Sequence, residues 1–154
     1  MTDSPASRQL SEQTIALVKA TAPALRAHGL AITQRMYERM FVNEEVKAMF
    51  DQAAQESGEQ PKKLAAAIIA YAENVDKLQN LTAPVLRMAA RHVEVGVRPE
   101  HYPIVADNLL PAIKDVLGDA ATDEVLGAWG EAYWFLAEIL IGKEADIYAQ
   151  QEAA

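Results

Sequence analysis

One histidine in this sequence lies where an apolar residue is expected. Non-polar residues occur at intervals of three and four around His92, which is the spacing of one helix face. The neighbours of His92 on that face are Val85, Met88, Ala89 and Gly96. A histidine in such a position is more often a core residue with both ring nitrogens hydrogen-bonded than a metal ligand. The chemical alternative is that His92 is the single protein ligand of a metal.

The rest of the chain limits which metal a lone histidine could hold. The 154 residues include no cysteine, which excludes thiolate metal sites, disulfides and covalent c-type haem attachment. Structural zinc takes four ligands, so His92 by itself is a poor zinc site, whereas haem iron can be held by one proximal histidine. The other two histidines indicate no site, because His28 falls at an expected helix end and His101, in a first turn, is expected to face water.

Glu144 is the second residue that could do chemistry. It shares an expected helix face with Trp129, Leu136 and Leu140, where an unpaired carboxylate would be costly to bury. Either it reaches water at the edge of the core, or it accepts a hydrogen bond from His92, with the Tyr102 hydroxyl joining. In the second case the carboxylate would fix the imidazole tautomer and make the ring a stronger metal ligand.

Two polar residues are candidates to face a small ligand on the other side of such a metal. Tyr37 lies on an inward helix face, and Gln60 lies at the junction of a loop and a helix. An inward tyrosine is more often a core residue, since its ring alone favours burial, and a glutamine at a junction is more often exposed. Neither residue is specific by itself.

The elements that must position these residues are all expected to be helices, because no segment alternates with period two. Residues 1–9 are expected to form a flexible polar tail, and residues 10–150 a single domain. The expected helices run from Ser11 to about His28-Gly29, from Leu30 to Phe41, from Pro61, from Thr82 through His92, from Pro99 to Gly118, and from about Thr122 to about Tyr148. Their unequal lengths argue against a symmetric four-helix bundle.

Composition argues against two broad classes of partner. The formal net charge is −8 and the pI about 4.8, so the surface repels phosphate backbones and nucleic-acid binding is not expected. The longest apolar run, Leu64 to Ala72, is far shorter than the roughly 20 residues that span a bilayer. Because the polar start also lacks the apolar core of a signal peptide, we expect a cytoplasmic protein without membrane insertion.

Several stretches taken together resemble one known family. They are QTIALVKAT, YERMF, the Gln60-Pro61 pair, RHVEVGV, HYPIV, IKDVLGDAATDEVL, AWGEAY and EADIYAQ. In this order they resemble the single-domain bacterial haemoglobins of the Vitreoscilla type and the globin domain of flavohaemoglobins, from Leu10 to Gln150. The resemblance implies an all-α globin fold with a haem pocket between the helices, and haem b (iron protoporphyrin IX) as the cofactor.

The resemblance also implies roles for individual residues. His92 matches the proximal iron ligand, and Tyr102 and Glu144 match the hydrogen-bonded backing of that histidine. Tyr37 matches a distal tyrosine that donates a hydrogen bond to a bound gas, and Gln60 matches a distal gate. Chemistry at the haem is thereby implied to be assisted by Tyr37, Tyr102 and Glu144. Further haem contacts are implied for Phe50, Leu64, Met88, Arg91 (a partner of a propionate), Val97, Tyr102 and Tyr133.

Two departures from the family pattern fall near the implied pocket. Phe50 follows Tyr37 by 13 positions, one fewer than usual, and the intervening VNEEV lacks the customary proline. We therefore expect a remodelled turn before Phe50. Trp134 stands where a glycine is usual, so we expect the core behind the haem, or a tunnel, to be more filled.

Three functions stay open at this point. The first is reversible binding of dioxygen, carbon monoxide and nitric oxide at a five-coordinate ferrous haem, for oxygen storage or delivery. The second is nitric oxide dioxygenation, or weak peroxidase activity, which would need a separate flavin reductase because the chain shows no G-x-G-x-x-G stretch. The third is a haem-free globin-like interaction domain. The resemblance to dimeric bacterial haemoglobins also implies a homodimer.

Overall fold

The structure is a computed structural model of the chain, and it describes residues 10–48, 59–94 and 96–153. Every regular element in these ranges is a helix, which confirms the expected all-α fold. The α-helices are α1 (Glu12–Met40), α2 (Glu44–Ala48), α4 (Glu59–Asn74), α5 (Thr82–Glu94), α6 (His101–Leu117) and α7 (Asp123–Ala153). Two short 3-10 helices, η2 (Leu78–Leu81) and η3 (Gly118–Ala120), precede α5 and α7.

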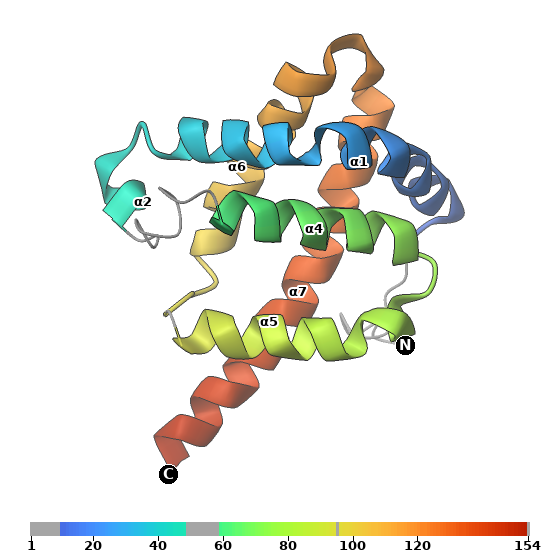
Figure 1. Ribbon diagram of the computed structural model, residues 1–154. Coiled ribbons are helices and arrows are strands. Elements are labelled where there is room, and N and C mark those ends of the chain that lie inside the picture. The colour runs from blue at the N-terminus through green and yellow to red at the C-terminus, as the bar shows by residue number, and fades with distance from the viewer. Residues whose placement is uncertain (1–9, 49–58, 95, 154) are drawn as a thin grey trace.

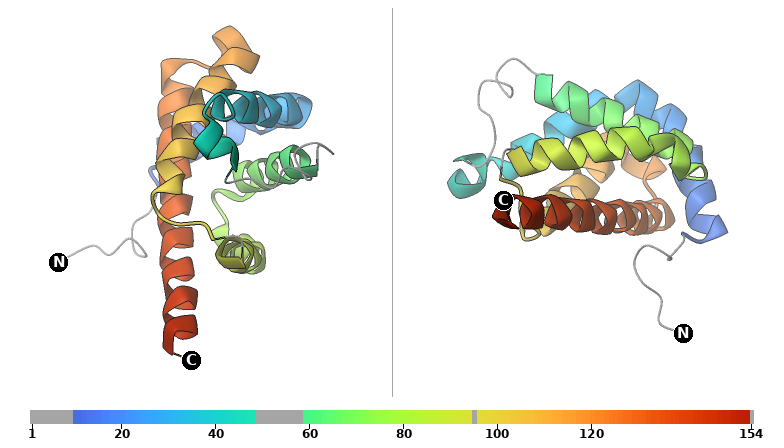
Figure 2. Two further views of the ribbon diagram at one scale, coloured as in Figure 1. Left: turned by 90° about the vertical axis from the view of Figure 1, so that its left-hand side faces the viewer. Right: turned by 90° about the horizontal axis from the view of Figure 1, so that it is seen from below.

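The helices are arranged in two crossing layers (Figure 1). The side view in Figure 2 shows α1, α4 and α5 one below the other, with α6 and α7 running across them in the second layer. α1 packs on α4, α6 and α7, and α5 packs on α7. Over the described residues α4 and α5 share a layer without packing closely on each other, and this part of the layer is where the candidate site lies.

α1 is one continuous helix of 29 residues, so the expectation of two segments divided at His28-Gly29 is wrong. Gly29 lacks the positive φ of a glycine that ends a helix. It is buried where α1 meets α4, and a Cβ added there would lie 3.5 Å from Ile69 Cδ1 and 3.7 Å from Ala65 Cβ. Gly29 is therefore an interior residue of α1 at its contact with α4, and it does not end the helix. Leu30, expected on the inward face, is 38% exposed.

Local signals place the other helix ends. The Ser11 hydroxyl accepts a hydrogen bond from the Thr14 N–H at 3.1 Å, and the Thr122 hydroxyl accepts one from the Val125 N–H at 3.2 Å, as expected of N-caps. Gly118 has φ of 59° and ends α6, which confirms the expected stop. α7 continues past the expected end near Tyr148, as far as Ala153.

The apolar core consists of two clusters of buried side chains. The larger cluster joins α1, α4, α6 and the first half of α7, around residues such as Trp129. The smaller cluster joins α5, α6 and the second half of α7, and includes Ala89 and Leu140. Tyr133 and Leu136 on α7 pack against both, so the second layer links the two clusters. Among the described residues, no helix combines the length and the apolar content needed to cross a membrane.

Candidate functional site

Three helices bring His92, Tyr102 and Glu144 together. His92 Nδ1 lies 2.7 Å from Glu144 Oε2 and 3.1 Å from the Tyr102 hydroxyl oxygen. The Tyr102 hydroxyl donates to the same carboxylate, at 2.8 Å from Oε2 and 3.0 Å from Oε1. The hydrogen bond expected between Glu144 and His92 is thus present, although 52 positions separate the two residues in the chain.

Burial explains why these hydrogen bonds are needed. Glu144 is 3% exposed and Tyr102 is 6% exposed, so the alternative that Glu144 reaches water is wrong. A carboxylate this deep is stable only with donors around it, and His92 and Tyr102 provide them. Burial, with a further contribution from the hydrogen bond to Glu144, raises the pKa of Tyr102 above its ordinary value. The phenol therefore stays protonated and remains a donor at neutral pH.

The end of α5 is shaped by a capping motif that fixes the backbone of His92. Gly96 has φ of 81°, its N–H bonds to the Val93 carbonyl at 3.1 Å, and the Val97 N–H bonds to the His92 carbonyl at 2.9 Å. This pair of bonds around a left-handed glycine is the Schellman pattern, which satisfies carbonyls left without partners at a helix end. His92 thus lies in the last turn of α5 with its carbonyl paired.

The first turn of α6 is fixed in turn by Tyr133 of α7. The Tyr133 hydroxyl donates to the Tyr102 carbonyl at 2.7 Å. Burial raises the pKa of Tyr133, so it too remains a donor at neutral pH. α7 therefore holds Tyr102 both by its side chain, through Glu144, and by its backbone, through Tyr133. A direct contact between Tyr133 and haem, implied by the resemblance, stays a prediction.

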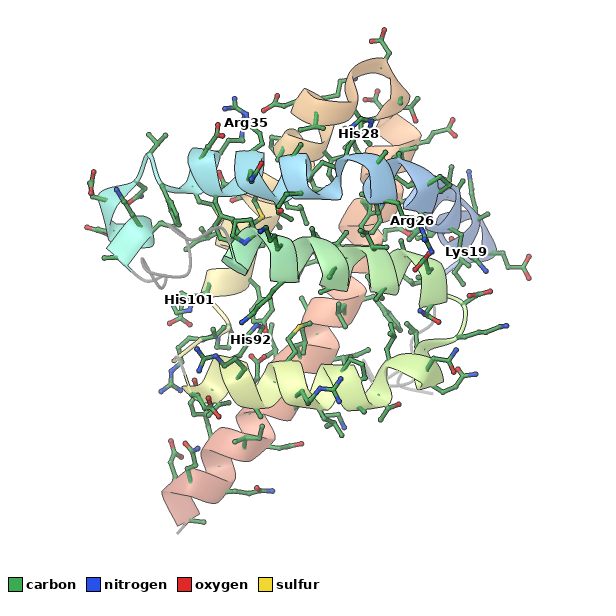
Figure 3. All side chains as sticks on the ribbon, in the orientation of Figure 1. Lys19, Arg26, His28, Arg35, His92 and His101 are labelled. Carbon is green, nitrogen blue, oxygen red and sulfur yellow. The ribbon has the colours of Figure 1, made fainter. Side chains whose placement is uncertain are left out.

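The hydrogen bonds leave His92 one nitrogen for a ligand. Because Nδ1 donates to Glu144, the neutral ring presents the lone pair of Nε2. The His92 side chain is 27% exposed, and in Figure 3 it points from α5 toward α4. Over the described residues, no three histidine or acidic side chains are placed to share a metal. The donor set fits an iron that takes one imidazole, as in haem, and does not fit a four-ligand zinc site.

Partly buried apolar side chains occur on α4, toward which His92 points, and on α5 with the loop that follows it. Leu64 and Ile68 of α4 pack against the larger cluster, whereas Met88 and Val97 pack against the smaller one. A flat apolar group bound between α4 and α5 could contact both sets and remove their remaining exposed surface from water. This pattern agrees with the expected haem contacts of Leu64, Met88 and Val97, which stay predictions.

Tyr37 lies on α1 and is 5% exposed. One turn earlier, the buried Thr33 hydroxyl donates to the Pro61 carbonyl at 2.9 Å and so anchors the start of α4 to α1. Gln60 belongs to the first turn of α4. The Gln60 side chain and the whole of Phe50 lie outside the described residues, so their implied places beside a haem stay predictions, as does the remodelled turn before Phe50.

Two side chains, Trp134 and His101, lie elsewhere than the sequence suggested. Arg91 pairs with Glu94 at 3.1 Å in an exposed ion pair on α5, and its contact with a propionate stays a prediction. Trp134 is 36% exposed on the outside of α7, so the expectation that it fills the core behind the haem is wrong. His101 is half-buried and accepts the Arg98 N–H at 3.0 Å, so it does not simply face water.

Sequence reasoning missed two residues near the cluster. The Tyr148 hydroxyl donates to the Val97 carbonyl at 2.8 Å, and the Arg98 guanidinium carbon lies 4.0 Å from the centroid of the Tyr148 ring. A signal was available for Tyr148, since it follows Glu144 by four positions and must share its helix face. No local signal marked Arg98.

Comparison with known proteins identifies the fold. The sequence model of the family described as Globin matches residues 34–140. The chain belongs to the globin family. This globin is 50% identical over 144 residues to a flavohemoprotein of Rhizobium meliloti, a match that covers 93% of this chain and 36% of the flavohemoprotein. The chain therefore spans about a third of the length of that relative.

Solved structures confirm that the globin fold expected from the sequence is correct. An engineered carbene transferase, which is a candidate nitric oxide dioxygenase from Rhodothermus marinus, matches with a TM-score of 0.87 and 43% identity over 94% of this globin and 99% of that chain. A flavohemoglobin from Malassezia yamatoensis with bound FAD and heme matches with a TM-score of 0.84 and 33% identity, over 93% of this globin and 38% of that chain.

Proposed function

We propose that this globin holds haem b through His92 and binds dioxygen and other diatomic gases reversibly. The observation that carries the proposal is the 2.7 Å contact between His92 Nδ1 and the buried Glu144, which leaves Nε2 to face a metal. When bound, haem would supply a ferrous iron that can take up a diatomic gas. The lack of cysteine in the chain supports a haem that is not covalently attached.

The residues of the chain divide into two groups in this proposal. Glu144 and Tyr102 hold the imidazole in one tautomer and one orientation. On the other side, Tyr37 donates a hydrogen bond to a bound gas, and Gln60 lies at the entrance. A hydrogen bond to an acceptor that carries charge contributes about 1.5–3 kcal/mol, or roughly tenfold and more in affinity.

Absorption spectroscopy tests the proposal directly. The purified protein, loaded with haem, is measured oxidised, reduced, and reduced under carbon monoxide. We expect a Soret band that shifts at each step, because each step changes the electronic state or the ligand of the iron. In His92→Gly the band of the reduced protein should change, and added imidazole should restore it, since free imidazole can occupy the position of the deleted side chain.

The matched control for that experiment is His28→Ala. His28 is an exposed histidine on α1, remote in sequence from the candidate site, so its loss should leave all three spectra unchanged. A wild-type protein that takes up no haem would contradict the proposal and favour the haem-free interaction domain. Spectra of His92→Gly identical to those of the wild type would contradict the role of His92 as the ligand.

Nitric oxide dioxygenation is a second candidate function. The short hydrogen bond from His92 to a buried carboxylate would make the imidazole a stronger electron donor to a haem iron held at Nε2, a property that suits oxidation chemistry. The similarity to a candidate nitric oxide dioxygenase adds support. Sustained consumption of nitric oxide, with nitrate as product and a flavin reductase supplying electrons, would establish this activity. A single stoichiometric reaction would leave reversible gas binding as the function.

Further expectations belong to the same proposal. We place the functional domain in residues 10–150, and the match of the Globin family model to residues 34–140 supports this. We also propose that the domain acts in the cytoplasm and forms a homodimer, on the strength of its resemblance to dimeric bacterial haemoglobins. Sedimentation of the haem-loaded protein over a range of concentrations would distinguish a dimer from a monomer.

A further inference from the structure

The loop that follows α5 is tied to α7 by one tyrosine. Val97 is the last residue of the capping motif at the end of α5, where its N–H bonds to the His92 carbonyl at 2.9 Å. The carbonyl of the same residue accepts the Tyr148 hydroxyl at 2.8 Å. One residue therefore connects the Tyr148 side chain to the backbone of the candidate metal ligand.

α7 is hydrogen-bonded to the last turn of α5 and to the loop that follows it. Glu144 binds the His92 ring at Nδ1, and Tyr148, one helical turn later, binds the backbone of Val97. The first contact fixes one edge of the imidazole. The second fixes the last turn of α5, which as a helix end would otherwise fray. The orientation of the ring relative to anything bound at Nε2 depends on both.

Arg98 completes this connection, which we call the Tyr148 latch and define as Tyr148, Val97 and Arg98. The Arg98 guanidinium carbon lies 4.0 Å from the centroid of the Tyr148 ring, a cation–π distance that favours the ring staying in place. The latch and Glu144 line a groove of about 250 Å³ between the loop and α7.

We infer that Tyr148 is a positioning residue for His92, because through Val97 it sets where the last turn of α5, and with it the imidazole, sits relative to the metal. The inference rests on the proposed haem function and adds a residue to it. It predicts that loss of one hydroxyl, on a residue that does not itself hold the haem in the proposal, changes the bond between His92 and iron.

The test compares Tyr148→Phe with Tyr71→Phe in the haem-loaded protein. Tyr71 is a matched control, because its hydroxyl also donates to a backbone carbonyl, that of Ala132 at 2.7 Å, in the larger core cluster. Tyr148→Phe keeps the ring that Arg98 covers and removes only the hydrogen bond. The first readout is the iron–histidine stretching band of the reduced protein in resonance Raman spectra. The second is amide hydrogen exchange over residues 93–102.

We expect Tyr148→Phe to shift or broaden the iron–histidine band and to speed exchange of the Val97 amide about fivefold, the factor that corresponds to a net hydrogen-bond contribution of about 1 kcal/mol. Tyr71→Phe should change neither. An unchanged band in Tyr148→Phe would overturn the inference, even if exchange became faster, because the latch would then be only structural. A wild-type protein without a Soret band would instead be the failure of the proposed function, so the two failures are distinguishable.

Discussion

At the residue scale, the chemistry of this globin depends on which nitrogen of His92 is already in use. A histidine with both nitrogens satisfied by the protein would be an ordinary core residue. Here Glu144 and Tyr102 both approach Nδ1, and the buried carboxylate of Glu144 is the stronger acceptor. This arrangement favours the tautomer that presents Nε2 to a ligand. Glu144 occurs on an otherwise apolar helix face because its carboxylate accepts the hydrogen bond of His92.

Removal of that carboxylate should be costly for the fold. Glu144→Ala leaves the partly buried His92 Nδ1–H and the buried Tyr102 hydroxyl without their shared acceptor, and we expect the free energy of unfolding to fall by about 2–3 kcal/mol. Glu144→Gln retains one acceptor oxygen and should cost less. Urea unfolding of each variant, with the same haem loading, measures the difference.

The control for this prediction is another carboxylate on an exposed helix face. Glu94 pairs with Arg91 at 3.1 Å, with both side chains about two-thirds exposed, so Glu94→Ala should leave stability almost unchanged. If Glu144→Ala proved no more damaging than Glu94→Ala, the buried cluster would not contribute to stability in the way its geometry indicates.

At the element scale, glycine has two different roles in this chain. Gly96 and Gly118 adopt positive φ and end α5 and α6. Gly29 lies inside α1 at the contact with α4, where a Cβ would meet Ile69 and Ala65 at ordinary van der Waals distances, so the contact does not require a glycine. The sequence context of Gly29, after a histidine and before an apolar stripe, resembles a helix end. Only the position of α4 shows that the helix continues.

Alanine substitutions should separate these two roles. Gly29→Ala should stabilise the protein by about 0.5–1 kcal/mol, because alanine has the higher helix propensity and the added methyl group fits without overlap. Gly118→Ala should instead destabilise by roughly 1 kcal/mol, since φ of 59° strains any residue with a Cβ. Thermal unfolding of the two variants beside the wild type would show the opposite signs. A loss of stability in Gly29→Ala would argue that α1 is broken at this residue.

At the scale of the whole molecule, buried tyrosines link stability to alkaline pH. Burial raises the pKa of Tyr71, Tyr102 and Tyr133 above the ordinary value of about 10. Above that pH the unfolded chain loses these protons while the folded protein keeps them. The folded state then binds more protons than the unfolded state, so stability is fully present below about pH 10 and falls as pH rises further.

We therefore expect the free energy of unfolding to decline above about pH 10, by up to about 1.4 kcal/mol per pH unit for each tyrosine that ionises only on unfolding. Urea unfolding between about pH 8 and about pH 11, together with tyrosinate absorbance, measures both sides of this linkage. The slope should be shallower in Tyr71→Phe, which removes one of the three groups. A flat profile to about pH 11 would contradict the assignment of buried, protonated hydroxyls.

The sequence alone determined the class of fold and the ends of most helices, because these depend on contacts within a few residues. Helical periodicity, the Ser11 cap and the Gly118 stop are local signals, and each agrees with the structure. The cluster of His92, Tyr102 and Glu144 could also be predicted, because a histidine and a carboxylate on apolar helix faces each need a polar partner. The resemblance to bacterial haemoglobins then implied haem as the cofactor, which the spacing of the residues by itself did not indicate.

What the tertiary structure decided is which distant segments meet. Gly29 proves to be an interior residue of α1 because α4 contacts α1 there, and Trp134 proves to be 36% exposed although its neighbour Tyr133 packs against the core. The Tyr148 latch joins residues 51 positions apart, so no local pattern could reveal its hydrogen bond. Contacts of this kind are set by how whole helices cross, and that depends on the fit of all their side chains at once.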